Sequence, residues 1–214
     1  DFSDEQITNV LRKLKDNDIT AIGMCGHTNI QTKEGQETFK RNLDLAHKLG
    51  VQYVTLSTGE THGDESKIED DSELVNIIKD LGNHAAKLGL TMAIETHGAN
   101  YATGQSIIAL LKKVNMPNVR LNYDTGNVVF YGGIMPYEDL DSSTGSITGI
   151  HLKEKAGAQN EWNFPAIGRG DLDFDRILKT LKKNGCTAAL SIEIEFTPAG
   201  PNGVEDVHES LQYS

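Results

Sequence analysis

The amino-acid sequence predicts an α/β fold in which amphipathic helices alternate with the strands of a parallel sheet. Stretches with apolar residues at helical spacing alternate along the chain with short runs of β-branched residues, as in successive βα units. Segments that follow the expected strands are long and rich in Gly, Thr, Asn and His, whereas segments that precede them are short. Both a (β/α) barrel and an open doubly wound sheet place functional loops after their strands, so this asymmetry allows either. A length of 214 residues with 37% hydrophobic and 24% charged residues fits one globular domain.

The helices are identified by their caps and by their apolar stripes. The first should begin near Ser3, because Ser3 and Gln6 have the spacing of a capping box. The second and third should end at Gly50 and Gly89, since glycine there favours a left-handed C-terminal cap. A short helix is expected around residues 136–140. The stripes are Ile7, Val10, Leu11 and Leu14; Phe39, Leu43, Ala46 and Leu49; Leu74, Ile77, Ile78, Leu81, Ala85 and Leu88; Ile107, Leu110, Leu111 and Val114; and Phe174, Ile177, Leu178 and Leu181.

A short β-rich run follows each of these helices, which gives six helix-to-strand units. No glycine-rich phosphate-binding pattern of the dinucleotide or P-loop type follows any run, which disfavours a nucleotide-binding sheet. The segment 153–171, with Trp162 and Phe164, is either a lid over a site or an ordinary surface loop. The strands are expected over residues 19–24, 51–57, 90–95, 119–124, 147–152 and 188–194.

Composition excludes several classes of protein. Lys and Arg total 20 against 31 Asp and Glu, and the formal charge of -11 repels polyanions, so no nucleic-acid partner is expected. No apolar run approaches the roughly 18 residues of a membrane span, and residues 1–10 lack the features of a signal peptide. We therefore expect a soluble cytoplasmic protein without a membrane partner. Cys25 and Cys186 are too few and too far apart for a disulfide framework or a cysteine-based zinc site, and both are expected to be buried thiols.

Residues of metal-binding types stand at the carboxyl ends of four successive expected strands: Glu95, Asp124, His151 and Glu193. In a closed barrel these ends converge, so three carboxylates and one imidazole could meet around a single divalent ion. Three neighbouring carboxylates repel one another unless a cation compensates them, which is the physical reason to expect a metal. The oxygen-rich donor set favours Mn²⁺ or Mg²⁺, and it also allows Co²⁺ or Zn²⁺.

Each of these residues alone also has an ordinary structural explanation. Asp124 could begin a turn, and His151 could be a hydrogen-bonded histidine at the end of a strand. Their common position in four consecutive units favours a shared site over four separate explanations. Glu195 competes with Glu193, because alternation along a strand points both side chains to one face and periodicity cannot choose between them.

Five short segments, spread in order over about half of the chain, carry a family pattern. They are 94–98 (IETHG), 123–127 (YDTGN), 151–154 (HLKE), 167–174 (IGRGDLDF) and 190–195 (LSIEIE). Together they resemble the xylose isomerase-like TIM-barrel superfamily, in particular its sugar phosphate isomerase/epimerase group, which includes ketose 3-epimerases, hydroxypyruvate isomerase and inosose dehydratase. The resemblance implies an α/β (β/α)8 TIM barrel with a metal site of Glu95, Asp124, His151 and Glu193. The spacing usual in the family favours Glu193 over Glu195.

The resemblance implies an enzyme, a divalent-metal-dependent isomerase or epimerase of a small sugar or sugar phosphate. Glu95 and Glu193 would be its acid/base pair, because one would remove a proton beside the substrate carbonyl and the other would return a proton to the enediolate. Return from the opposite face gives epimerisation, return at the neighbouring carbon gives isomerisation, and loss of a β-hydroxyl gives dehydration. The alternatives are a metal-dependent lyase or dehydratase of a keto-sugar or keto-inositol, and a non-catalytic sugar-binding module.

Further polar residues on the same rim are expected to bind the small-molecule sugar or sugar phosphate: His27, His97, Asn127, Lys153 and Arg169. Glu60, His62 and Lys155 could also do so, or they could be ordinary solvated loop residues. The DNA-repair branch of the superfamily, endonuclease IV, requires a histidine-rich trinuclear zinc site and has a histidine where Asn127 stands. This departure disfavours DNA cleavage.

Length is a second departure from the family. A (β/α)8 barrel typically needs about 250 residues, and this chain begins on what resembles the second helix of the family. We therefore expect a single TIM-barrel domain over residues 1–214 that is N-terminally incomplete, with the first strand, first helix and second strand missing. An unclosed parallel sheet exposes two edges, so we also expect a homo-oligomer.

Overall fold

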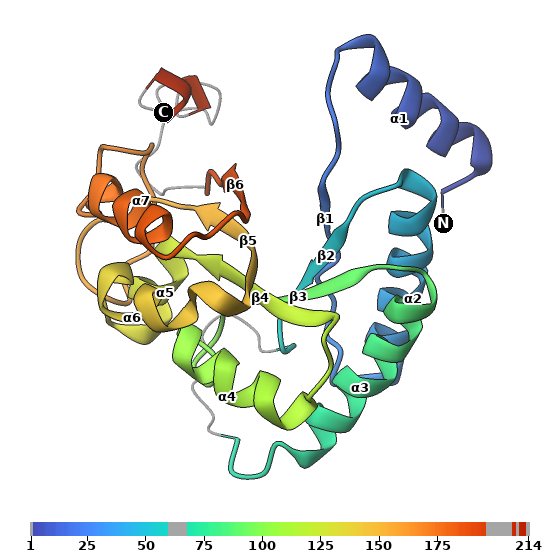
Figure 1. Cartoon of the computed structure of the whole chain (residues 1–214), viewed down its shortest axis with the longest axis horizontal. Helices are drawn as coiled ribbons and strands as arrows, with labels where there is room; N and C mark the ends of the chain where they lie inside the picture. The colour runs from blue at the N-terminus through green and yellow to red at the C-terminus, as the bar shows by residue number, and fades with distance from the viewer. Residues whose placement is uncertain (1, 60–67, 196–206, 209, 213–214) are drawn as a thin grey trace. The chain divides into compact units, whose positions relative to one another are not determined.

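The computed structural model describes residues 2–59, 68–195, 207–208 and 210–212, to which every structural statement refers (Figure 1). Glu60 and His62 lie outside the described residues. Among the described helices, none combines the length and the apolar character needed to cross a membrane. In chain order the elements are α1 (Asp4–Asp16), β1 (Gly23–Cys25), α2 (Lys33–Leu49), β2 (Tyr53–Leu56), α3 (Ser72–Lys87), β3 (Thr91–Glu95), α4 (Gly104–Val114), β4 (Val119–Asp124), α5 (Thr125–Gly132), α6 (Pro136–Ser143), η1 (Thr144–Ser146), β5 (Ile147–Leu152), α7 (Phe174–Lys183) and β6 (Ala189–Ile192).

The described chain divides into two compact units. The first contains residues 2–59, 68–94 and 110–120, and the second contains residues 95–109, 121–195 and the few described residues beyond. Within each unit the hydrogen-bonded strand order follows the chain, β1-β2-β3 in the first and β4-β5-β6 in the second. The single, N-terminally incomplete domain over residues 1–214 stays a prediction.

In the first unit β1, β2 and β3 pair in parallel, with Gly23 opposite Tyr53 and Tyr53 opposite Thr91. The apolar faces of α2 and α3 provide much of the core of this unit, as their helical spacing predicts. The fully buried apolar side chains include Phe39, Leu43, Ala46, Val54, Leu56, Ile78, Leu81 and Met92.

The caps predicted for the helices of the first unit are confirmed. Ser3 Oγ accepts a hydrogen bond from the backbone N–H of Gln6 at 3.2 Å, and Gln6 Oε1 accepts one from the backbone N–H of Ser3 at 2.8 Å. Gly50 and Gly89 have φ values of 73° and 71°, in the left-handed region that glycine adopts at low cost. Local sequence thus determines where these helices begin and end.

In the second unit β4, β5 and β6 pair in parallel, with Asp124 of β4 opposite His151 of β5. Helix α4 begins against α6, where the buried Asp139 carboxylate accepts the backbone N–H groups of Gly104 at 2.6 Å and Gln105 at 3.1 Å. Thr103 caps α4 locally, because its hydroxyl accepts the backbone N–H of Ser106 at 3.2 Å. The Asp139 carboxylate satisfies the two N–H groups before it, so a distant residue completes the local cap.

Helix α5 is the main difference from the sequence-based prediction, which left Thr125–Gly132 outside the helices. Its sequence TGNVVFYG contains two glycines and two valines, which have low helix propensity. The helix forms because Asp124 caps it and because Val128 and Val129 are buried. Tertiary packing therefore overrides local propensity here.

Two edge strands are shorter than predicted. β1 covers Gly23–Cys25 instead of residues 19–24, and β6 covers Ala189–Ile192 instead of residues 188–194. Ile19 and Ile22 expose 57% and 37% of their surface, so burial does not hold the start of the predicted first strand in the sheet.

The prediction that both cysteines are buried is wrong. Cys25 is exposed and Cys186 is half-buried, and both thiols are free. Cys25 is the last residue of the short strand β1. Cys186 lines a cavity of about 310 Å³ beside the partly exposed Leu178 and Leu190. Neither thiol lies in the packed interior, although burial is the usual environment of this residue type.

Candidate metal centre

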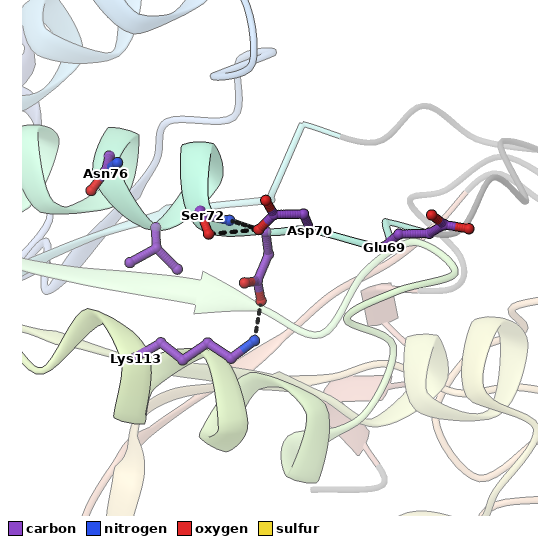
Figure 2. Close-up of a pocket in the computed structure, with 7 residues that line it drawn as sticks. Glu69, Asp70, Ser72, Asn76 and Lys113 are labelled. Carbon is purple, nitrogen blue, oxygen red and sulfur yellow. Dashed lines mark hydrogen bonds and ion pairs between the residues drawn. The ribbon is translucent and has the colours of Figure 1, made fainter.

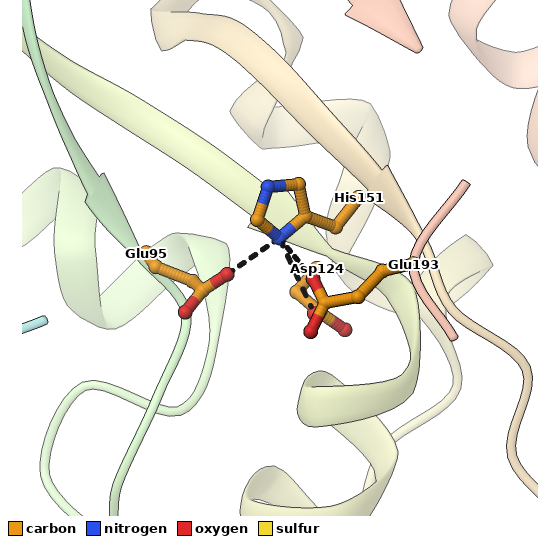
Figure 3. Close-up of side chains that lie close together, drawn as sticks. All are labelled: Glu95, Asp124, His151 and Glu193. Carbon is orange, nitrogen blue, oxygen red and sulfur yellow. Dashed lines mark ion pairs between the residues drawn. The ribbon is translucent and has the colours of Figure 1, made fainter. Parts of the chain in front are cut away.

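Four side chains converge in the second unit, at the ends of successive strands (Figure 3). Glu95 ends β3, Asp124 ends β4, His151 lies in β5, and Glu193 directly follows β6. One donor atom of each residue lies within 4.8 Å of the other three. Parallel pairing explains the convergence, because Asp124 is opposite His151 and the backbone N–H of Glu193 bonds to the carbonyl of Leu152 at 3.0 Å.

The His151 ring lies at the centre of the cluster. Its Nδ1 is 2.7 Å from Glu95 Oε1 and 3.7 Å from Asp124 Oδ2, and it also contacts Glu193 Oε2 (Figure 3). A ring nitrogen carries at most one hydrogen and so cannot satisfy three carboxylates by hydrogen bonding. The convergence of four donor atoms is the arrangement that a coordinated cation requires.

Burial makes the charge of this cluster costly. Asp124 is fully buried and Glu95 is 4% exposed. The ammonium of the buried Lys153 lies 3.0 Å from Asp124 Oδ2 and 2.7 Å from Glu193 Oε1. Three carboxylates and one ammonium leave two negative charges when His151 is neutral, and one divalent cation would balance them. The donor types, the convergence and the charge therefore fit a divalent metal.

The same charges shift the pKa values of the cluster. Burial raises the pKa of Asp124, but Lys153 and His151 outweigh burial and lower that pKa to about 2. Burial lowers the pKa of His151, but the carboxylates of Asp124, Glu193 and Glu95 outweigh burial and raise it to about 12. The raised pKa of His151 shows that the carboxylates favour positive charge at the centre of the cluster, and the lowered pKa of Asp124 shows that the positive groups beside it keep it ionised.

The two carboxylate oxygens of Asp124 have different environments. Oδ1 accepts the backbone N–H groups of Gly126 at 2.9 Å and Asn127 at 2.8 Å, which caps helix α5. Oδ2 faces His151 and Lys153. Glu95 is held in a similar way, because the side-chain amide of Asn122 donates to its Oε1 at 3.4 Å. Backbone and amide donors thus orient two carboxylates toward the cluster.

Some of the residues predicted to bind substrate lie beside the cluster. Asn127 is buried, and its Oδ1 accepts a hydrogen bond from Lys153 Nζ at 3.2 Å. His97 is also buried, with Nε2 at 3.1 Å from the hydroxyl of Tyr131. Sequence reasoning missed Tyr131, because it lies on the unpredicted helix α5.

The remaining candidates differ from these two in exposure or in their contacts. His27 and Arg169 are exposed, and His27 belongs to the first unit. Glu195 lies outside the cluster of four and contacts Lys153 Nζ through Oε1 at 3.3 Å. Lys155 is buried, but its ammonium bonds to backbone carbonyls, including that of Ala158 at 2.9 Å, and so it holds its own loop.

Aromatic rings from α5 and the loop after β5 form a packed group. The ring centroids of Phe130 and Trp162 are 5.5 Å apart, and those of Trp162 and Phe164 are 5.1 Å apart. Lys153 Nζ lies 5.4 Å from the centroid of the Phe164 ring. Edge-to-face contacts of this kind make a rigid apolar wall beside the charged cluster.

A separate hollow of about 490 Å³ lies in the first unit at the start of α3 (Figure 2). Four of its polar side chains, those of Asp70, Asp71, Ser72 and Lys113, are engaged in local structure. Asp70 Oδ1 accepts the backbone N–H of Ser72 at 2.9 Å and its hydroxyl at 2.6 Å, and Asp71 Oδ2 pairs with Lys113 Nζ at 2.6 Å. These contacts explain the acidic residues as the cap and anchor of a helix.

A family model described as "Xylose isomerase-like TIM barrel" matches residues 1–213. The chain belongs to the xylose isomerase-like TIM barrel family. The predicted fold class is thereby confirmed, and the parallel strands with intervening helices are those that this family requires.

Curated relatives of this TIM barrel family are sugar-modifying enzymes. An inosose dehydratase of Clostridium botulinum (strain Alaska E43 / Type E3) is 27% identical over 223 residues, which cover 86% of this chain and 72% of the relative. An L-ribulose-5-phosphate 3-epimerase of Shigella flexneri serotype 5b is 27% identical over 165 residues, which cover 75% of this chain and 56% of the relative.

Solved structures share the family fold. A xylose isomerase domain protein from Planctomyces limnophilus has a TM-score of 0.80 and 24% identity, and the match covers 99% of this chain and 82% of that one. The IOLI protein with a bound zinc atom has a TM-score of 0.78 and 20% identity, covering 98% and 80%. A xylose isomerase-like TIM barrel protein from Mycobacterium smegmatis in complex with magnesium has a TM-score of 0.76 and 19% identity, covering 99% and 77%.

Proposed function

We propose that this protein is a divalent-metal-dependent isomerase or epimerase that acts on a small sugar or sugar phosphate through an enediolate. The cluster of Glu95, Asp124, His151 and Glu193 is the observation that carries the proposal, because its donors fit one divalent cation. Relatives named as an epimerase and as dehydratases of sugar-like substrates support the substrate class. Mn²⁺ or Mg²⁺ are the preferred ions, and Zn²⁺ or Co²⁺ also suit the donor set.

Glu95 and Glu193 are the proposed acid/base pair. When bound, the cation would polarise the substrate carbonyl and a neighbouring hydroxyl, which acidifies the carbon between them. In Figure 3 Glu95 and Glu193 approach the same nitrogen of His151 from different directions, so a substrate at the cluster would meet two separate carboxylates, and epimerisation needs one group to remove the proton and another to return it on the opposite face. Glu95 is buried, whereas the side chain of Glu193 is 28% exposed, so the two carboxylates differ in access to solvent protons.

The remaining site residues are proposed to bind the substrate: His27, His97, Asn127, Lys153 and Arg169. The Tyr131 hydroxyl is added to this set, since it contacts His97. Buried imidazole, amide and hydroxyl groups suit the hydroxyls of a sugar, and the wall of Phe130, Trp162 and Phe164 suits its C–H faces. Cytoplasmic location, self-association and the absence of a nucleic-acid partner remain predictions.

Metal content is the first test of this proposal. Protein purified without chelator should contain about one divalent ion per chain by elemental mass spectrometry, and the Glu95→Gln/Asp124→Asn variant should contain none. Asp139→Asn is the matched control, because Asp139 is an equally buried carboxylate of the second unit that lies outside the cluster. Wild-type protein that holds no metal even after addition of Mn²⁺ would contradict the proposal.

Proton exchange with solvent is the second test. Ketoses incubated with the enzyme in D₂O should gain deuterium beside the carbonyl, as seen by NMR, and single Glu95→Gln or Glu193→Gln variants should lose several orders of magnitude of this rate. A dehydratase would instead release a product with a new conjugated absorbance from a keto-inositol. Full activity in both glutamine variants would contradict the acid/base assignment.

A further inference from the structure

Lys153 is the most unusual charged residue of the second unit. Its side chain is 4% exposed, and Nζ lies within hydrogen-bonding distance of four oxygens. These are Glu193 Oε1 at 2.7 Å, Asp124 Oδ2 at 3.0 Å, Asn127 Oδ1 at 3.2 Å and Glu195 Oε1 at 3.3 Å. Nζ donates hydrogen bonds to Asn127 and Glu195, and it forms ion pairs with Asp124 and Glu193, so the ammonium is surrounded by oxygen atoms.

The surroundings of Lys153 fix its charge in place. The Thr125 hydroxyl accepts the backbone N–H of Lys153 at 3.0 Å and donates to its carbonyl at 2.7 Å. The aliphatic part of the side chain crosses Gly126, where an added Cβ would lie 2.9 Å from Lys153 Cγ. A residue with any side chain at position 126 would displace the lysine. The ammonium therefore has a fixed position in the site, unlike the charge of a mobile surface lysine.

We propose that Lys153 determines the charge of the cation that the cluster accepts, and that it restricts the cluster to divalent ions. This inference rests on the proposed function, since it concerns the same metal site. When His151 is neutral, the four cluster residues and Lys153 carry two net negative charges, which a divalent cation neutralises and a trivalent cation exceeds. The Glu195 carboxylate is left out of this count because its side chain is 29% exposed and solvent screens its charge. An uncompensated charge in a buried site raises the free energy of the bound state. The positive charge of Lys153 therefore disfavours a trivalent ion.

A second effect of Lys153 acts in the same direction. Lys153 binds Oε1 of Glu193, which leaves Oε2 to face His151. Without the lysine, Glu193 would have both oxygens available to a cation. Trivalent ions of the lanthanide type prefer many charged oxygen donors, as Ca²⁺ does. Loss of Lys153 should therefore raise the affinity for a trivalent ion for two reasons: the site becomes more negative, and Glu193 gains a second oxygen that can bind the ion.

The test is a competition between Mn²⁺ and La³⁺, with bound Mn²⁺ measured by electron paramagnetic resonance. The variants are Lys153→Met and Lys153→Gln, which remove the charge, and Lys153→Arg, which keeps it. In both neutral variants the ratio of La³⁺ affinity to Mn²⁺ affinity should rise by about tenfold or more, because a unit charge close to the ion acts more strongly on the higher charge. Lys153→Arg should stay near the wild-type ratio.

Two further variants make the result decisive. Lys155→Met removes an equally buried lysine that binds backbone carbonyls, and it should leave the ratio unchanged. Glu195→Gln removes a negative charge from a side chain that is 29% exposed, and it should lower the ratio about severalfold. This variant keeps the test valid if the neutral Lys153 variants do not fold, as judged by circular dichroism.

The outcomes separate this inference from the proposed function. If the wild type binds Mn²⁺ and all variants show the same ratio, Lys153 does not select the charge and only this inference fails. The same conclusion follows if Lys155→Met shifts the ratio as much as Lys153→Met. If the wild type binds neither ion, the proposed metal-dependent function itself fails.

Discussion

Asp124 shows how one side chain can serve both the fold and the site. Its Oδ1 caps α5 through two backbone N–H groups, and its Oδ2 faces His151 and Lys153. An amide side chain keeps an acceptor for the cap but loses the charge, whereas a methyl group loses both. The two contributions can therefore be separated by substitution.

Asp124→Asn and Asp124→Ala should both abolish metal binding, but only the alanine variant should lose the cap of α5. We expect Asp124→Ala to have a free energy of unfolding about 1 kcal/mol lower than that of Asp124→Asn, measured by urea denaturation without metal. Asp173 provides the control, since its Oδ1 caps α7 by accepting the N–H of Arg176 at 2.9 Å. The Asn and Ala variants of Asp173 should differ by a similar amount, with metal content unchanged. Equal stabilities of the two Asp124 variants would contradict this role of Oδ1.

At the scale of elements, the loop after β5 is organised by a buried carboxylate. Glu154 is 1% exposed and accepts the backbone N–H groups of Lys155 at 3.0 Å, Gly168 at 2.9 Å and Leu172 at 3.1 Å. The segment that carries Arg169 is therefore wrapped around this side chain. A loop with so many satisfied backbone groups behaves as a defined element.

Gly170 is the point of closest approach in this loop. An added Cβ there would lie 2.6 Å from both Glu154 Oε1 and the carbonyl oxygen of Lys155. We expect Gly170→Ala to lower the free energy of unfolding by about 1 to 3 kcal/mol, because backbone and a buried carboxylate must move apart. Gly145→Ala is the control, since no atom lies within 4 Å of its added Cβ, and it should change stability by less than about 0.5 kcal/mol. Urea denaturation of both variants tests the difference.

At the scale of the whole molecule, the stability of the folded state should increase with the concentration of the metal ion. A ligand that binds only the folded state stabilises it by about 2.7 kcal/mol at a hundred times its Kd. The thermal midpoint of the wild type should therefore rise with added Mn²⁺ and fall with a chelator. The Glu95→Gln/Asp124→Asn variant should show no such dependence in differential scanning fluorimetry. An equal rise in both proteins would indicate binding outside the cluster.

Self-association is the second prediction at this scale. The sequence predicts exposed sheet edges, and in the second unit Leu178 and Leu190 leave 41% and 48% of their surface exposed. Large apolar side chains exposed to this extent favour association. Size-exclusion chromatography with light scattering should give a mass of at least two chains. A mass of one chain, about 23.4 kDa, across a tenfold dilution series would contradict the prediction.

Sequence alone could predict much of this fold, because caps and apolar stripes act locally. Ser3, Gly50 and Gly89 behave as their neighbours predict. Helix α5 could not be predicted, since its cap and its buried valines depend on tertiary contacts. The strand-end residues could be proposed from their common position. Alternation along a strand could not choose between Glu193 and Glu195, and only the spacing usual in the family favoured Glu193, the residue found in the cluster. The four contacts of Lys153 could not be predicted from the sequence, because they depend on how β4, β5 and β6 are aligned with one another.

The three consecutive charged residues 153–155 have a consequence for chemical labelling. The charges of the sequence Lys-Glu-Lys predict an exposed segment, yet each of the three residues is at most 3% exposed. Amine-reactive reagents should therefore modify surface lysines such as Lys15 and Lys179 while Lys153 and Lys155 stay unmodified. Opening of the second unit would expose both amines at once. These two lysines are thus internal reporters of partial unfolding, which mass spectrometry of labelled peptides could follow without any engineered probe.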